Sequence, residues 1–301
     1  MRVRISEAEM AERIETLDAL LSPCRLCPHC CMVDRRHGER GRCGVGVAAK
    51  VASFGPHFGE EPPLVGRRGS GTVFFSGCNL SCVFCQNYVI SQLGKGEEIT
   101  TQDLATIFLD LARRGCHNIN LVTPTHQAPA IVSALALAEQ AGLELPIVWN
   151  CGGYESPEVL LLLDGIVDIY MPDVKYGDDA PAARYSGASD YATNLEAVLR
   201  EMHRQVGDLV IEEGIAQRGL LVRHLVLPGG IAASDRVFEL IASRLGRETY
   251  VNVMEQYRPC YRADRHPDLA RRPALSEYVE AVNAARGRGL NRGLPTFENG
   301  T

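Results

Sequence analysis

The sequence predicts an α/β protein: a (β/α)6 partial barrel of parallel strands with a small N-terminal Cys-rich knuckle. Six short runs of apolar, β-branched and aromatic residues alternate with helical stretches, which favours parallel strands joined by right-handed crossovers. Polar residues follow nearly every run. A barrel brings all strand ends to one mouth, where the sites of β/α barrels lie, whereas an open doubly wound sheet would spread them along an edge. We therefore favour the partial barrel.

The composition is that of a soluble globular chain, with 301 residues of which 46% are hydrophobic and 23% charged. The net charge of −6 argues against a generic nucleic-acid-binding face. Apolar runs are too short to span a bilayer, and residues 1–15 lack the apolar centre of a signal peptide. We expect a cytoplasmic protein with no membrane partner and no generic nucleic-acid binding.

The distribution of cysteine, glycine and proline divides the chain into three segments. The first begins with a helix over residues 6–21, because Ser6 and Glu9 form a capping box before an amphipathic stretch. The segments are 1–46, the helix and a Cys-rich metal knuckle; 47–70, a Gly/Pro-rich linker packed on the core; and 71–301, the partial barrel with its C-terminal helix.

Strands and helices alternate along the third segment. Helix starts are marked by Thr100 with Asp103, and by Ser156 followed by Pro157. The expected strands are 72–75, 119–123, 146–149, 166–171, 220–227 and 249–254. The expected helices are 101–114, 129–141, 156–163, 192–206, 234–245 and 275–287.

Three cysteines follow directly on the first expected strand, with the spacing Cys78-x3-Cys82-x2-Cys85. Clustered thiols in a reducing compartment indicate metal binding or catalysis rather than disulfides. Three thiolates can bind three irons of a cubane and leave the fourth iron without a protein ligand. An open position is typical of catalytic metal sites, whereas structural zinc needs a fourth ligand that the motif lacks.

This motif, with Phe84 before its last cysteine, resembles the radical S-adenosylmethionine (SAM) superfamily. The resemblance implies a [4Fe–4S] cluster on Cys78, Cys82 and Cys85, with SAM bound to the fourth iron through its amino and carboxylate groups. Similarity to the branch related to pyruvate formate-lyase activating enzymes covers residues 20–290. It rests on CRLCPHCCMVDRRHGERGRCG, GCNLSCVFCQNYVIS, HNINLVTPTH, GIVDIYMPDVKY, RGLLVRHLVLPGG and YVNVMEQYRPC.

The resemblance implies an oxidoreductase chemistry in which the cofactor supplies reactivity and the protein supplies position and exclusion. SAM would be cleaved reductively to methionine and a 5′-deoxyadenosyl radical, which abstracts hydrogen from a substrate that the sequence does not identify. A glycyl-radical enzyme is one candidate target, as for an activase. A low-potential electron donor such as flavodoxin or ferredoxin is the expected partner.

Five residues are candidates for binding the cofactors. Many members of the superfamily grip the SAM amine with a Gly-Gly-Glu stretch, and here that position holds Thr123 and Thr125, whose hydroxyls or backbone carbonyls could replace it. Asn79 and Phe84 flank the cluster cysteines, and Asn150 ends the third expected strand.

Three further residues are candidates for catalysis or substrate binding. Asp173 and Lys175 follow the fourth expected strand, where substrate contacts are expected, although the two side chains could instead pair structurally. Arg258 follows the last strand and could clamp a carboxylate or phosphate.

The knuckle contains a second group of cysteines, in the register Cys24-x2-Cys27-x3-Cys31-x11-Cys43. A competing register uses Cys30 in place of Cys31, and the sequence leaves both open. Four thiolates suit either structural zinc or a second iron–sulfur cluster. Neighbouring arginines favour thiolates, because positive charge lowers a thiol pKa.

A rival hypothesis from another class is a metal-knuckle or iron–sulfur protein that binds metal or transfers electrons without SAM chemistry. Both hypotheses predict bound metal, but only the radical SAM reading predicts 5′-deoxyadenosine formed with a reductant. Within that reading, a protein target predicts a broad mouth, and a small-molecule target predicts a closed pocket with Arg258 inside.

Overall fold

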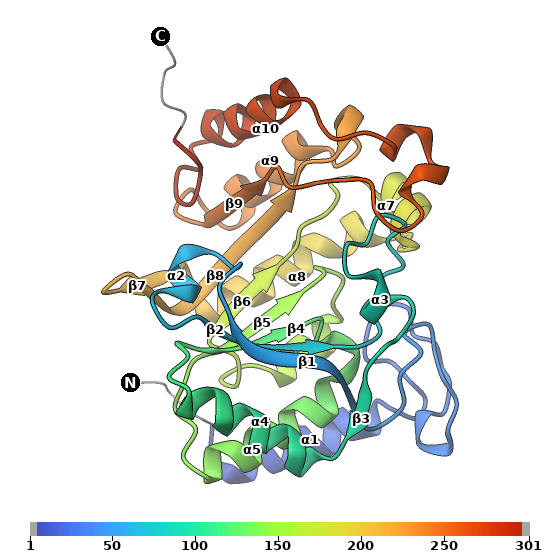
Figure 1. Ribbon diagram of the computed structural model, residues 1–301, viewed down its shortest axis with the longest axis vertical. Helices are drawn as coiled ribbons and strands as arrows, with labels where there is room; N and C mark the ends of the chain where they lie inside the picture. Colours follow the sequence, from blue (N-terminus) through green and yellow to red (C-terminus); the bar gives the residue numbers. More distant parts are fainter. Residues whose placement is uncertain (1–4, 297–301) are drawn as a thin grey trace.

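The computed structural model describes residues 5–296 and shows a mixed α/β protein with a mostly parallel central sheet (Figure 1). The α/β class predicted from the sequence is confirmed. The outermost residues, 1–4 and 297–301, which the first and third expected segments include, lie outside the described part.

Parallel pairing joins strands taken in chain order across the sheet. The pairs run in register, as Val73 with Leu121 and Leu121 with Trp149 show, and these three side chains are fully buried. Near-continuous apolar runs are expected for strands that are covered on both faces. Within residues 5–296 the parallel strands are β2 (Ser70–Phe75), β4 (Ile119–Val122), β5 (Ile147–Cys151), β6 (Ile169–Pro172), β8 (Ile215–Leu225) and β9 (Tyr250–Met254).

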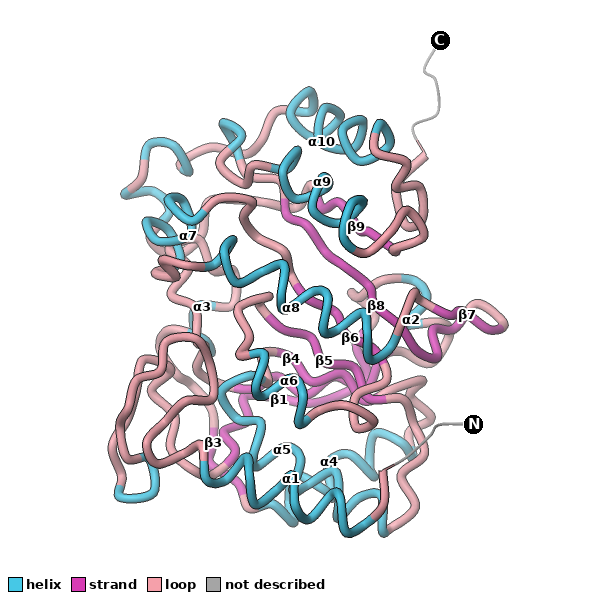
Figure 2. The backbone as a smooth tube through the Cα atoms, turned by 180° about the vertical axis from the view of Figure 1, so that it is seen from behind, coloured by secondary structure: helices cyan, strands magenta, loops and turns pink. Residues whose placement is uncertain are grey.

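Helices surround the outer face of this sheet, some in front of the strands and others below or above them in Figure 2. The capping box of Thr100 and Asp103 is present, and so is that of Ser6 and Glu9 at the start of α1 (Glu7–Ala19). No helix in the described part has the length and apolar composition that a membrane crossing requires. The other helices at predicted positions are α4 (Thr101–Arg113), α5 (Ala128–Gln140), α6 (Pro157–Leu162), α8 (Tyr191–Val206), α9 (Ser234–Arg244) and α10 (Leu275–Gly287).

The segment 47–70, expected to be a linker, contains regular structure, and that prediction is corrected. Strand β1 (Ala49–His57) pairs antiparallel with β2 and with β3 (Glu97–Ile99), and the short helix α2 (Pro62–Val65) follows it. Gly55 and Pro56 interrupt its apolar alternation, so only pairing with β2 reveals the strand. The sequence also missed α3 (Tyr88–Ser91), α7 (Asp179–Ser186) and the hairpin strand β7 (Val210–Glu212).

The knuckle follows α1 and lies beside α3 and β3 (Figure 1). It contains little regular structure beyond a 3-10 turn, Arg35–His37. The buried Arg35 fastens it to the body: its Nε donates to the carbonyl of Gly46 at 3.1 Å, and its Nη1 donates to the carbonyl of His126 at 2.8 Å. The knuckle is therefore anchored to the loop that follows β4.

Candidate active site

A cavity of about 370 Å³ lies where the parallel strands end. Its walls come from the carboxyl ends of β4, β5, β6, β8 and β9 and from the loop after β2. Pockets of this size hold one small ligand and are usually lined by apolar groups with a few placed polar groups. The polar residues that follow successive strands thus gather at one site.

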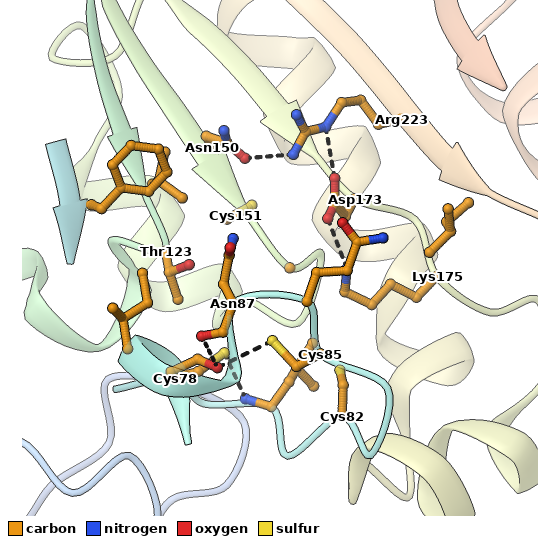
Figure 3. Close-up of a pocket in the computed structure, with 18 of the residues that line it drawn as sticks. Cys78, Cys82, Cys85, Asn87, Thr123, Asn150, Cys151, Asp173, Lys175 and Arg223 are labelled. Atoms are coloured by element: carbon orange, nitrogen blue, oxygen red, sulfur yellow. Dashed lines mark hydrogen bonds and ion pairs between the residues drawn. The ribbon is translucent and has the colours of Figure 1, made fainter. Parts of the chain in front are cut away.

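Cys78, Cys82 and Cys85 line one side of this cavity, on the loop between β2 and α3 (Figure 3). Burial raises the pKa of Cys82 to about 11 and also raises the pKa of Cys78. Negative charge on the other cysteines of the motif raises both pKa values further. Thiolates at these positions would repel one another, so a bound cation is needed for them to lose their protons together.

Hydrogen-bond donors surround these sulfur atoms. The Ser186 hydroxyl donates to Cys82 Sγ at 2.9 Å, and the backbone N–H two residues beyond Cys78 donates to its sulfur at 3.3 Å. Cys85 Sγ lies 3.1 Å from the Ser91 hydroxyl. Hydrogen bonds to sulfur tune iron–sulfur clusters. Three thiols on one cavity wall, each with such a partner, fit a cluster bound through three cysteines.

Arg223 of β8 lies at the centre of a buried polar network on the opposite wall (Figure 3). Its Nε donates to Asp173 Oδ1 at 2.7 Å, and its Nη2 donates to Asn150 Oδ1 at 2.9 Å. Its Nη1 donates to Glu60 Oε2 at 3.0 Å. Lys175 Nζ donates to the second Asp173 oxygen at 2.7 Å. The network ties β5, β6 and β8 to the segment after β1.

Asp173, Lys175 and Arg223 keep their charges at neutral pH. Burial alone would raise the pKa of Asp173, but Arg223 and Lys175 lower it to about 2. Burial opposes the charge of Lys175 and Arg223 as well, and Asp173 outweighs it, so both pKa values rise. Burial raises the pKa of Glu60, an effect that Arg223 reduces. Both cations are thus already paired with carboxylates.

Thr123 occupies an unusual backbone conformation at the end of β4. Its φ is 61°, in the left-handed region that β-branched residues rarely adopt. Its N–H donates to the carbonyl of Asn150 at 2.8 Å, and the residue lines the cavity. Strained residues that the surrounding structure holds in place cluster at functional sites.

The sequence of the chain is similar to a known family and to two proteins of one organism. Residues 72–211 match the family model of the Radical SAM superfamily. The chain is 32% identical over 288 residues to an uncharacterized protein of Methanocaldococcus jannaschii, covering 93% of this chain and 79% of the relative. A second uncharacterized protein of that organism is 25% identical over 302 residues, covering 93% and 81%.

The chain belongs to the radical SAM superfamily. Membership supports an iron–sulfur enzyme that cleaves SAM, with a [4Fe–4S] cluster and SAM as its cofactors. The matched residues run from β2 to β7 and therefore include the cluster cysteines and the network on β5 and β6.

Five of the residues predicted from the sequence lie on the radical SAM cavity. Asn150, Asp173, Lys175 and Thr123 line it as described, and Phe84 lines it with its ring edge-to-face against Tyr257, 5.7 Å between centroids. Phe84 and Tyr257 are buried, so they close the cavity with apolar surface next to the cluster loop.

Three predicted residues do not line the cavity. The Asn79 amide N–H donates to the carbonyl of Tyr154 at 2.6 Å, and its Oδ1 lies 3.9 Å from Cys78 Sγ, outside the cavity wall. The Thr125 hydroxyl donates to the buried carboxylate of Glu155 at 2.7 Å. Arg258 is exposed on the loop after β9 and is not part of the cavity wall.

Of the acidic and basic side chains that line the cavity, Arg223 and Glu60 were not predicted from the sequence. Arg223 lies within the run 220–227, expected as a strand, and a charged residue in an otherwise apolar strand was the available signal. Glu60 lies in the expected linker, and only the pairing of β1 with β2 carries it to the cavity, beside His57.

The knuckle of this radical SAM protein brings four of its five cysteines together. Burial raises the pKa of Cys27, and the thiols of Cys43, Cys31 and Cys24 raise it further, so these four lie close to one another. Cys30 is exposed, with its sulfur 3.6 Å from the carbonyl of Cys27. The exposure of Cys30 and the effect of Cys31 on Cys27 favour the register that uses Cys31.

Histidines do not join this thiol group. His29 Nε2 lies 2.7 Å from the carbonyl of Asn79, and His37 is exposed beside Asp34. Across residues 5–296, no three His, Cys, Asp or Glu side chains are arranged to hold a single metal ion as they stand. A cubane places each cysteine on a different iron, so the cluster cysteines need not converge on one point.

Proposed function

We propose that the protein is a radical SAM enzyme in which Cys78, Cys82 and Cys85 hold the [4Fe–4S] cluster. When bound, the cluster and SAM supply a one-electron cleavage to methionine and a 5′-deoxyadenosyl radical that abstracts hydrogen from the substrate. The observation that carries the proposal is the gathering of three thiols and the polar ends of successive strands on one cavity. Walls made of strand ends and the cluster loop would limit the access of solvent to a reactive species in that cavity.

The chain's own residues would bind and orient SAM. Of the two threonines, Thr123 reaches the cavity and Thr125 does not, so we assign the SAM amine to Thr123. Asn150 is positioned by Arg223, which leaves its amide N–H groups available for a ribose hydroxyl. Phe84 provides apolar surface beside the cluster loop.

The resemblance to pyruvate formate-lyase activating enzymes supports a more specific proposal. We propose a (β/α)6 partial barrel acting in the cytoplasm as an activase-like oxidoreductase, with a glycyl-radical protein as one target. Thiolate ligands suit a reducing compartment. Arg258 does not line the cavity, which favours a protein target over a small molecule held by Arg258.

Reconstitution tests the proposal. The protein is purified anaerobically, loaded with iron and sulfide, and assayed for 5′-deoxyadenosine with SAM and dithionite. We expect product from the wild type and from Cys260→Ala, whose thiol lies outside the cavity, and background levels from Cys78→Ala. No product from wild type with a well-formed cluster would leave the metal-binding or electron-transfer reading instead.

We also propose that Cys24, Cys27, Cys31 and Cys43 bind a second metal centre, either zinc or an iron–sulfur cluster. Their mutual proximity supports this assignment. Zinc and iron are quantified in a background that lacks the three cluster cysteines, so that only the knuckle contributes. Cys31→Ala should lose the remaining metal and Cys30→Ala should retain it; equal retention by both variants would contradict the assignment.

A further inference from the structure

A second hollow, a groove of about 290 Å³, lies between the knuckle and the cluster loop. It shares Cys78, Ser91 and Gln92 with the active-site cavity, whereas its remaining walls come from the knuckle, from Lys50 of β1 and from the turn after α3, none of which line the cavity. The residues that matter here are Arg42, Cys43, Lys50, Cys78 and Leu93.

The groove is positively charged. Arg42 and Lys50 line it, no Asp or Glu does, and neither cation forms an ion pair with a carboxylate in residues 5–296. Other cations of the knuckle are neutralised, Arg25 by Glu158 and Arg40 by Glu98. Residues 22–50 contain six Lys and Arg against two Asp and Glu, in a chain whose net charge is −6.

The groove also offers an apolar contact and a path to the cluster. Leu93 lines it with 58% of its surface exposed. Cys78, a cluster ligand in the proposed function, forms part of the floor. The adjoining Gly77 packs so closely on the knuckle that a Cβ there would lie 2.5 Å from the carbonyl of Cys43. A molecule in the groove therefore approaches the cluster without entering the cavity that SAM and substrate need.

We infer that this groove docks an acidic low-potential electron-transfer protein of the flavodoxin or ferredoxin class. The reduced donor loses one electron and the cluster on Cys78 gains it, with no bond formed or broken between the two proteins. Arg42 and Lys50 attract the acidic surface of the donor, since complementary charge steers association and raises on-rates. The inference rests on the proposed function, because it needs a cluster at Cys78.

Charge reversal tests the docking site. The holoenzyme is mixed with flavodoxin hydroquinone at low ionic strength, and cluster reduction is followed by stopped-flow absorbance. The double variant Arg42→Glu/Lys50→Glu should lower the second-order rate about 10-fold or more and flatten its salt dependence. Reduction by dithionite, which needs no docking surface, should remain at the wild-type rate, and 5′-deoxyadenosine formation with dithionite should persist.

The matched control reverses two other arginines. Arg258 and Arg265 are exposed on the loop after β9, which also contacts the cluster loop through the backbone N–H of Arg262 and the carbonyl of Val83, 2.8 Å apart. Arg258→Glu/Arg265→Glu should leave the flavodoxin rate unchanged. A slower rate in this control with a normal rate in the groove variant would overturn the inference. Failure of dithionite reduction in wild type would instead contradict the proposed function.

Binding supplies a readout that does not depend on turnover. A carbodiimide joins an amine to a carboxylate, so oxidised flavodoxin should crosslink to the holoenzyme through Lys50, as peptide mass spectrometry would show. The crosslink should be lost in Lys50→Glu and kept in Arg258→Glu/Arg265→Glu. A short single-stranded RNA serves as a competing polyanion: if RNA binds at the groove and flavodoxin does not, the donor assignment is wrong.

Discussion

At the scale of single residues, Glu155 shows how burial sets a charge state beside the active site. Its carboxyl is 1% exposed and accepts hydrogen bonds from Thr125 Oγ1 at 2.7 Å and Trp149 Nε1 at 3.4 Å. Burial raises the pKa of Glu155 from 4.5 to about 7, even though these hydrogen bonds lower it. The folded protein therefore holds this proton more tightly than the unfolded chain does.

We expect Glu155→Gln to remove a pH dependence of stability. Because the folded-state pKa is raised, the stabilising contribution of the protonated carboxyl is fully present below pH 4.5 and is lost as the pH rises towards 7. The glutamine stays neutral, so the variant should gain stability over wild type, from under about 1 kcal/mol at pH 5 to about 3 kcal/mol at pH 8. Urea unfolding across this range measures the difference. The exposed Glu15→Gln is the control, and a parallel response in both variants would contradict the assignment.

Arg223 is the residue whose loss should disturb the cavity most. Arg223→Met leaves the buried carboxylates of Asp173, Glu60 and Glu61 without their shared cation, so the free energy of unfolding should fall by about 3–5 kcal/mol. Arg223→Lys keeps the charge but loses the planar guanidinium group, so the free energy of unfolding should fall by less. Arg244→Met removes a surface ion pair and should change stability by under about 1 kcal/mol. Denaturant unfolding at pH 7 ranks the three variants.

At the scale of elements, local signals and long-range pairing differ in what they reveal. The start of α4 was predicted correctly because a capping box lies within four consecutive residues, 100–103. Strand β1 was missed because its hydrogen bonds go to β2 and β3, which lie far away in the sequence. Helix boundaries are therefore more visible than edge strands.

The cap of α4 can be tested directly. Thr100 Oγ1 accepts a hydrogen bond from the backbone N–H of Asp103 at 3.1 Å, so Thr100→Ala should lower the free energy of unfolding by about 1 kcal/mol. Thr106→Ala, at an exposed mid-helix position of the same helix, removes only a bond to the carbonyl of Gln102 and should be close to neutral or slightly stabilising. Equal losses measured by urea unfolding would show that Thr100 does not act as a cap.

At the scale of the whole molecule, the knuckle and the barrel-like body meet at the cluster loop. Arg35 joins the knuckle to the loop after β4, and Gly77 allows the knuckle backbone to approach next to Cys78. The body thus positions both cysteine groups, although they are separated by more than thirty residues of chain between Cys43 and Cys78.

Gly77→Ala should loosen this contact. The residue has a φ of 78°, and a Cβ there would lie 2.5 Å from the carbonyl of Cys43. Gly214→Ala is the matched control, because its φ is 81° but nothing lies within 4 Å of its Cβ position. In the control, backbone strain alone should lower the free energy of unfolding by about 1–2 kcal/mol. Gly77→Ala should lose about 1–3 kcal/mol more by urea unfolding, because a tightly packed contact is overfilled. Equal losses would show that the close approach is unimportant.

The sequence by itself determined the features that depend on short spacing. The three cluster cysteines lie within eight residues, strands and helices alternate visibly between residues 72 and 287, and the helix starts are marked by their caps. These signals are local, so no knowledge of distant contacts is needed to see them. The family resemblance rests on the same short segments.

Only the tertiary structure decided which polar side chains reach the cavity. Arg223 and Glu60 do, whereas Asn79, Thr125 and Arg258 do not. The direction of a side chain depends on the conformation of its backbone and on partners far away in the sequence, such as the carbonyl of Tyr154 for Asn79. The same reason separates Cys31 from Cys30: the two are adjacent in sequence, but in the folded knuckle Cys30 is exposed, whereas the thiol of Cys31 raises the pKa of Cys27.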